Sequence, residues 1–200
     1  MVWDIFSGVY DPVEKIVNRK VYAEIGDIAA RFVDKDDLVL ECACGTGAMT
    51  VKIAEKCRRL AAADLSTGMM SQARKKCAGF DNVRFFKADI TDLKVADETF
   101  DKVIAGNVIH LLNEPQKAVS ELVRVCKKGG TVIIPTYITN LDDPVQKAEK
   151  KAMEIAGIHF DHDFTAETYK QFFRDMGCEN AEFITAEGRF PCMFAVLNKI

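Results

Sequence analysis

The chain has 200 residues, a formal net charge of −3 and 48% hydrophobic residues. This length and apolar content suit one domain with a sizeable core. The weakly acidic balance argues against nucleic acid as a partner, and no apolar run approaches the roughly 20 residues of a membrane-spanning helix. The first ten residues do not resemble a signal peptide, and the seven scattered cysteines favour reduced thiols. We therefore expect a cytoplasmic domain over residues 1–200.

The N-terminal third begins with an aromatic stretch, residues 1–12, that we expect to be irregular. Apolar residues at helical spacing then predict one helix over residues 13–32, which completes an N-terminal cap (residues 1–32). Residues 38–42 form a continuous apolar run apart from Glu41, typical of a central strand covered on both faces. A first crossover helix is predicted over residues 47–56.

Strands and helices then alternate as far as residue 137. Strands are predicted at residues 60–64, 83–88, 100–106 and 131–137, helices at 66–78 and 114–125, and a sharp turn at 127–130. Ser66 is in place to cap its helix. This alternation predicts a parallel sheet with helices on both faces.

The rhythm changes after residue 137, where residues 138–164 read as an insertion that could act as a lid. It holds a polar helix at 142–156 and a stretch rich in His, Asp and Phe at 158–164. Thr165 then caps a helix that Gly177 ends, and two final strands suggest an antiparallel hairpin. The predicted fold is therefore α/β, a Rossmann-like doubly wound, mostly parallel seven-stranded sheet with a C-terminal antiparallel hairpin.

Four features fall at successive strand ends, which right-handed crossovers bring to one edge of the sheet. They are the small-residue turn at 41–47 (E-C-A-C-G-T-G), Asp64, Asp89 with Ile90, and residues 106–108 (G-N-V). A glycine-rich turn allows a ligand to approach the backbone, and a carboxylate at a strand end can accept hydrogen bonds from ribose hydroxyls. All four features in order indicate a nucleoside-containing ligand.

With these motifs the chain resembles class I S-adenosylmethionine (AdoMet)-dependent methyltransferases, and it is similar to the ubiquinone/menaquinone-biosynthesis group. The resemblance implies AdoMet as cofactor and S-adenosylhomocysteine as product. It places the turn against the methionyl part, Asp64 at the ribose, and Asp89 at the adenine. The full set of cofactor-binding residues it implies is Tyr10, Arg19, Glu41, Ala43, Cys44, Gly45, Gly47, Asp64, Leu65, Met69, Asp89, Ile90, Asn107 and Val108.

Two residues depart from the family pattern. Glu41 ends the first strand where Asp is commoner, which keeps the charge but lengthens the side chain. Ala43 occupies the position of the first family glycine, and its methyl group is tolerated if the backbone there is not left-handed.

Methyl transfer needs positioning and desolvation more than a particular base, so no catalytic residue is assigned. His110, His162 and Tyr10 are candidates; His110 is equally suited to holding a loop. His159 and His162 could bind metal, but they more often cap a helix or face water, and Cys42 with Cys44 lacks a second ligand pair. We expect no metal.

Three functions remain open. A thin cap leaves little surface for a macromolecule, which favours methylation of a small molecule. An NAD(P) oxidoreductase would share Gly45, Gly47 and Asp64, but Thr50 stands where its third glycine would be. A non-catalytic AdoMet-binding module would carry the same motifs as the enzyme.

Overall fold

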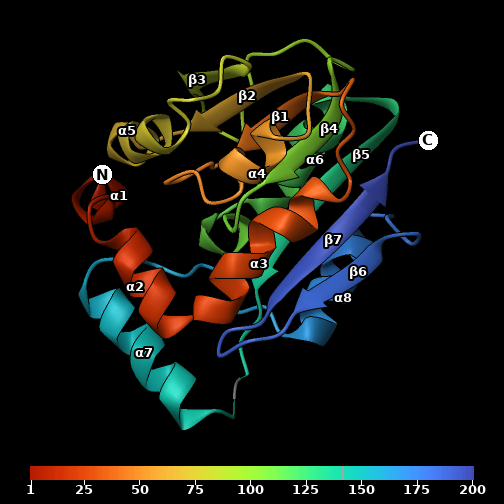
Figure 1. Ribbon diagram of the computed structural model, residues 1–200. Coiled ribbons are helices and arrows are strands. Elements are labelled where there is room, and N and C mark those ends of the chain that lie inside the picture. Colours follow the sequence, from red (N-terminus) through yellow and green to blue (C-terminus); the bar gives the residue numbers. More distant parts are fainter. Residues whose placement is uncertain (141) are drawn as a thin grey trace.

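The computed structural model describes residues 1–140 and 142–200, and its centre is a seven-stranded sheet in the order β3-β2-β1-β4-β5-β7-β6 (Figure 1). Neighbouring strands from β3 to β5 are parallel, whereas β7 is antiparallel to both β5 and β6. The strands are β1 (Leu38–Cys42), β2 (Arg59–Asp64), β3 (Val83–Lys87), β4 (Phe100–Ala105), β5 (Cys126–Tyr137), β6 (Glu182–Ala186) and β7 (Cys192–Asn198). The predicted α/β fold with its closing antiparallel hairpin is confirmed.

Helices cover both faces of the sheet, and the central strands carry apolar side chains on both faces to pack against them. Side chains alternate along each strand, so Val39 and Ile104 face one layer whereas Leu40 and Val103 face the other. The first layer contains buried residues of α3 and α4, and the second contains those of α6 and α8. The helices are α1 (Val2–Phe6), α2 (Tyr10–Val17), α3 (Arg19–Ala30), α4 (Thr50–Ala54), α5 (Thr67–Lys76), α6 (Pro115–Val125), α7 (Pro144–Ile155) and α8 (Ala166–Asp175).

Helix-capping residues lie where the sequence predicts them. The side chain of Ser66 accepts a hydrogen bond from the Met69 amide at 3.1 Å. Thr165 forms a reciprocal capping box with Thr168, and Gly177 follows α8 with φ +77°.

The N-terminal region is where the prediction is wrong. Residues 1–12 are largely helical, and the helix expected over residues 13–32 is two helices, α2 and α3, that separate at Asn18. Asn18 leaves the helical conformation (φ −133°, ψ 42°). Its side-chain amide donates to the carbonyl of Phe190 at 2.8 Å, a contact 172 residues away that local periodicity does not encode.

Two other boundaries also differ from the prediction. The first crossover helix begins at Thr50, because Gly45 (φ +52°) and Gly47 (φ +86°) hold the preceding turn in left-handed conformations. The expected turn at residues 127–130 is an irregular start of β5. There the chain pairs with the end of the molecule, since the Gly129 amide donates to the Lys199 carbonyl at 2.7 Å.

The insertion at residues 138–164 includes residue 141, which lies outside the described residues. Its helix α7 begins after Asp143, whose carboxylate accepts a hydrogen bond from the Val145 amide at 2.8 Å. Figure 1 shows α7 beside α2 of the N-terminal cap, away from the sheet. Within the described part of the chain, no helix combines the length and apolarity needed to cross a bilayer.

Candidate functional site

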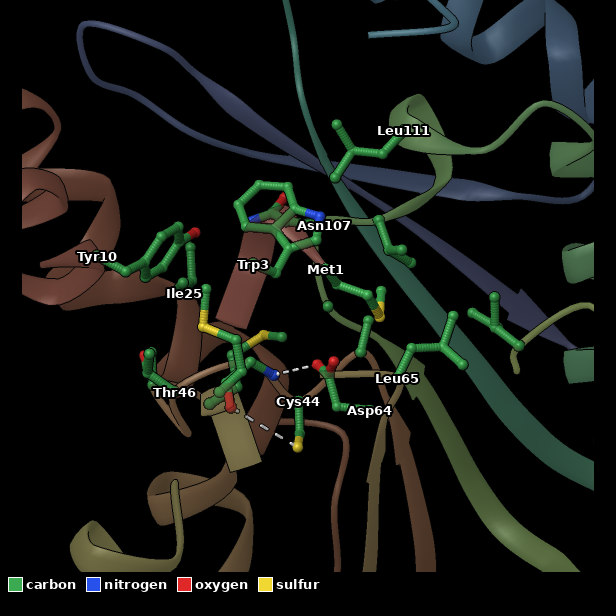
Figure 2. Close-up of a pocket in the computed structure, with 18 of the residues that line it drawn as sticks. Met1, Trp3, Tyr10, Ile25, Cys44, Thr46, Asp64, Leu65, Asn107 and Leu111 are labelled. Carbon is green, nitrogen blue, oxygen red and sulfur yellow. Dashed lines mark hydrogen bonds between the residues drawn. The ribbon is translucent and has the colours of Figure 1, made fainter. Parts of the chain in front are cut away.

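A cavity of about 280 Å³ opens at the carboxyl ends of β1, β2 and β4, where the strand order reverses. We call it the donor cavity. Ligands of doubly wound sheets bind at this position because the loops diverge there. Figure 2 shows Asp64 and Leu65 on one side of it and Tyr10, Trp3 and Asn107 on others.

The Asp64 carboxylate is fixed by two backbone amides. Gly45 donates to Oδ2 and Ser66 donates to Oδ1, both at 2.8 Å (Figure 2 shows the first). Burial raises the pKa of Asp64, and the backbone hydrogen bonds oppose that shift. Each carboxylate oxygen retains a further lone pair, so the group can still accept hydrogen bonds from a ligand hydroxyl.

The turn after β1 and the loop after β4 each contain a non-glycine residue with an unusual backbone conformation. Ala43 and Asn107 both adopt left-handed conformations, with φ +52° and +48°. The condition under which an alanine would be tolerated at position 43 is therefore not met. This residue carries a conformational cost of about 1–2 kcal/mol that a glycine would not.

Glu41 is fully buried and does not line the donor cavity. Neither of its carboxylate oxygens has a hydrogen-bond partner among the described residues. Burial raises its pKa to about 8, and the charge of Asp64 raises it further. The carboxyl group is therefore largely protonated at neutral pH.

Most of the predicted cofactor-binding residues meet at this cavity. It is lined by Tyr10, Ala43, Cys44, Gly45, Asp64, Leu65, Met69, Ile90, Asn107 and Val108.

Arg19, Gly47 and Asp89 do not line it. Arg19 is exposed at the start of α3, and Gly47 approaches Ala73 of α5 closely. The Asp89 carboxylate accepts hydrogen bonds from the amide and hydroxyl of Thr91, at 2.8 and 2.7 Å.

The N-terminal cap covers the donor cavity, and Met1 and Trp3 contribute to it in addition to the predicted Tyr10. Met1 and Trp3 line it, and Trp3 packs edge-on against Tyr10 with ring centroids 6.3 Å apart. Asp4 attaches α1 to α5, because its carboxylate accepts hydrogen bonds from the Ser66 hydroxyl and the Gly68 amide.

A second attachment ties the cap to the turn after β1. The Asp11 carboxylate accepts hydrogen bonds from the Tyr22 hydroxyl at 2.7 Å and the Thr46 hydroxyl at 2.5 Å, and it forms an ion pair with Lys76. Desolvation acts to raise the pKa of Asp11, but these three partners together lower it. The carboxylate is therefore charged in the closed cap.

A larger cavity of about 400 Å³ adjoins the donor cavity and lies among α2, α7 and residues 158–163. We call it the second cavity. The two cavities share four wall residues, Trp3, Tyr10, Asn107 and Leu111, all labelled in Figure 2. The thiol of Cys192 donates to Oδ1 of Asn107 at 3.3 Å, which leaves the amide nitrogen available to a ligand at the junction.

Both histidine candidates line the second cavity. Nδ1 of His110 is 2.8 Å from the Thr136 hydroxyl, and its ring stacks on Phe160. Burial lowers the pKa of His110 to about 4, so the ring is neutral at physiological pH. Nε2 of His162 is buried without a partner among the described residues, whereas His159 is exposed.

The metal alternatives gain no geometric support. Within residues 1–140 and 142–200 no three His, Cys, Asp or Glu side chains gather at metal-binding distances. Burial raises the pKa of both Cys42 and Cys44 above that of a free thiol, which disfavours the thiolate that metals bind.

Comparisons with known proteins show similarity to methyltransferases. Residues 40–134 match the family model described as "Methyltransferase domain". The chain is 39% identical over 101 residues to a demethylmenaquinone methyltransferase of Clavibacter sepedonicus, covering 50% of this chain and 41% of that protein. It is 30% identical over 151 residues to a phosphatidylethanolamine N-methyltransferase of Cereibacter sphaeroides, covering 74% and 70% respectively.

A solved structure supports the fold. The SAM-dependent methyltransferase of Thermotoga maritima superposes with a TM-score of 0.71 at 20% identity, covering 98% of each chain. The present chain spans less than half of the Clavibacter relative and 70% of the Cereibacter relative. The similarity in sequence, the order of the strands and the position of the donor cavity all indicate the same family. The chain belongs to the family of S-adenosylmethionine-dependent methyltransferases.

Proposed function

We propose that this protein transfers a methyl group from AdoMet, held in the donor cavity, to a small molecule held in the second cavity. The observation that carries the proposal is the shared wall. Trp3, Tyr10, Asn107 and Leu111 line both cavities, so ligands in the two would meet at these residues.

The donor cavity suits the parts of AdoMet. Gly45 presents backbone without a side chain, and apart from its chain neighbours no atom of the described residues lies within 4 Å of where its Cβ would be. Asp64 offers carboxylate oxygens for the ribose, and the apolar side chains of Leu65, Met69 and Ile90 suit an adenine ring. The same residues would serve a non-catalytic AdoMet-binding module, but that role gives no reason for an adjoining cavity.

The chain's contribution to the reaction is positioning. The sulfonium of AdoMet supplies an electrophilic methyl group, and transfer requires a nucleophile held in line with it and shielded from water. The aromatic rings of Trp3 and Tyr10 stand at the junction, where they exclude water and favour a cationic sulfonium. His110 is neutral but held by Thr136 and Phe160, so we assign it to the cavity wall.

The acceptor we propose is a small molecule with a substantial apolar part. The second cavity is lined mainly by apolar and aromatic side chains, among them Phe6, Val13, Val17, Met153 and Phe160. The names of the two relatives specify demethylmenaquinone and phosphatidylethanolamine as acceptors, and both molecules contain long apolar chains.

Isothermal titration calorimetry with AdoMet, S-adenosylhomocysteine and NADH tests the donor assignment. We expect micromolar binding of the two sulfur ligands, no binding of NADH, and at least about tenfold weaker binding by Asp64→Ala, equivalent to about 1.4 kcal/mol. Binding of NADH in place of the sulfur ligands would refute the proposal. Methyl transfer to demethylmenaquinol or phosphatidylethanolamine, followed by mass spectrometry, would distinguish an enzyme from a binding module.

A further inference from the structure

The second cavity contains a carboxylate that the proposed function leaves unexplained. Glu14, on the second turn of α2, lines this cavity but not the donor cavity. It lies one helical turn after Tyr10, which lines both. The carboxylate therefore stands in the second cavity, next to its junction with the donor cavity.

Glu14 has polar partners, but they are neutral. Oε2 accepts a hydrogen bond from the Tyr137 hydroxyl at 3.0 Å. Burial, and to a smaller extent the negative charge of Asp11, raise the pKa of Glu14 above its usual value, although the hydrogen bond from Tyr137 opposes the shift. Among residues 1–140 and 142–200, no lysine or arginine lies within ion-pair distance of this carboxylate.

The other charged side chains of the cavity wall are already neutralised by protein partners. Lys150 pairs with Asp163 at 2.5 Å, and Glu149 pairs with Arg189 at 2.5 Å. Asp11, the acidic neighbour of Glu14, pairs with Lys76. A carboxylate held in a mainly apolar cavity without a counter-ion gains most from a ligand that brings positive charge.

We propose that the second cavity takes an acceptor with an apolar body and a protonated amine, and that the Glu14 carboxylate binds the ammonium group and accepts its proton. This inference rests on the proposed methyl transfer. The aromatic rings of Tyr10 and Tyr137 also line the second cavity and add a cation-binding environment, and apolar side chains such as Val13 and Met153 would cover the body of the acceptor.

The reaction balances with these groups alone. One proton passes from the ammonium to Glu14, which leaves a neutral amine with a free lone pair. That lone pair forms the new N–C bond while the C–S bond of the sulfonium breaks and its electrons stay on sulfur. The products are a methylated ammonium ion and S-adenosylhomocysteine, and the protonated Glu14 returns its proton to solvent.

Three probes of equal chain length separate charge from apolar contact: n-octylamine, 1-octanol and octanoate. Calorimetry on the full chain, with and without saturating S-adenosylhomocysteine, should show octylamine binding about tenfold or more tightly than octanol, and octanoate most weakly. This comparison requires no variant. Equal affinity for octylamine and octanol, or tighter octanoate binding, would overturn the proposal.

Glu14→Gln keeps the size and the hydrogen-bond acceptor for Tyr137 but removes the charge. We expect it to weaken octylamine binding by about tenfold and to leave octanol and S-adenosylhomocysteine within about twofold. Glu24→Gln, on α3 and outside the walls of both cavities, is the matched control and should change neither. Unchanged octylamine binding by Glu14→Gln would refute the assignment.

Turnover tests the proton step. With AdoMet, wild-type protein should convert octylamine to N-methyloctylamine, and Glu14→Gln should lower kcat as well as raise KM for the amine. Octylamine that binds but is not methylated would overturn its assignment as an acceptor. Failure of S-adenosylhomocysteine to bind would instead refute the proposed function, and the amine titration without it would still decide the role of Glu14.

Discussion

Gly106 lies against the carbonyl of Ala43, so closely that a Cβ at position 106 would stand 2.8 Å from that oxygen and 2.9 Å from Cε of Met49. Met49 is flexible at that end, but the Ala43 carbonyl is backbone and can move only if the turn moves. The contact joins the loop after β4 to the turn after β1, which are the two segments that form the floor of the donor cavity.

Gly106→Ala should therefore damage both stability and donor binding. We expect a loss of about 1–3 kcal/mol in the free energy of unfolding, because overpacking a rigid contact forces the backbone to shift. Urea unfolding and titration with S-adenosylhomocysteine measure the two effects. Gly79→Ala is the control, because beyond the chain neighbours no atom in the described part of the chain lies within 4 Å of the added Cβ. An equally small effect at both sites would contradict the argument.

The two glycines of the turn after β1 should respond differently to alanine. Both have positive φ, but a Cβ on Gly45 meets open space whereas one on Gly47 would lie 3.0 Å from Ala73 Cα. Gly45→Ala should cost about 1–2 kcal/mol of conformational strain, and it should weaken donor binding because it projects into the cavity. Gly47→Ala should cost more stability than Gly45→Ala, and the reverse order in thermal unfolding would be inconsistent with the structure.

Glu41 should make the protein less stable as the pH rises. Its pKa is about 8 in the folded protein and 4.5 as the reference value, so between these values the folded state holds more protons than the unfolded state. The free energy of unfolding should then fall with rising pH by up to about 1.4 kcal/mol per unit. Glu41→Gln should reduce this slope between pH 5 and 8 in urea unfolding, and an unchanged slope would exclude the effect.

His110 should act in the opposite direction at lower pH. Burial lowers its pKa from 6.5 to about 4, so the unfolded state binds the extra proton between these values. The free energy of unfolding should therefore decrease as the pH falls from 6.5 towards 4. His110→Gln, which can still bond to Thr136, should flatten this limb of the pH–stability curve, and a limb of the same steepness in the variant would argue against a buried neutral ring.

The Asp11 attachment should hold the cap over a bound donor. Asp11→Asn removes the ion pair with Lys76 and weakens the bonds to Tyr22 and Thr46. The Asp11 side chain remains 18% exposed, so solvent partly screens its ion pair. We therefore expect a modest loss of about 1 kcal/mol in stability. A faster dissociation of S-adenosylhomocysteine should be seen by stopped flow. Asp27→Asn breaks one exposed ion pair with Lys52 and should leave that rate unchanged.

The sequence predicted the sheet because local patterns determine it. Continuous apolar runs such as residues 38–42 specify strands buried on both faces, and Ser66, Thr165 and Gly177 specify helix ends through their own side chains or backbone freedom. The small and acidic residues that follow those strands also form a pattern among neighbouring positions of the chain. It was therefore enough to predict the family and ten of the residues that line the donor cavity.

Only the tertiary structure showed how the predicted cap is divided and attached, and where the second cavity lies. The break at Asn18 depends on Phe190, and the cover over the donor cavity depends on Asp4 and Asp11 reaching α5 and the turn after β1. Glu14 occupies an ordinary position in a helix, and its isolation from cations appears only when Tyr137 is brought beside it from 123 residues away. The spacing of hydrophobic residues indicates which face of a helix or strand is buried, but it does not indicate which distant side chain packs against that face.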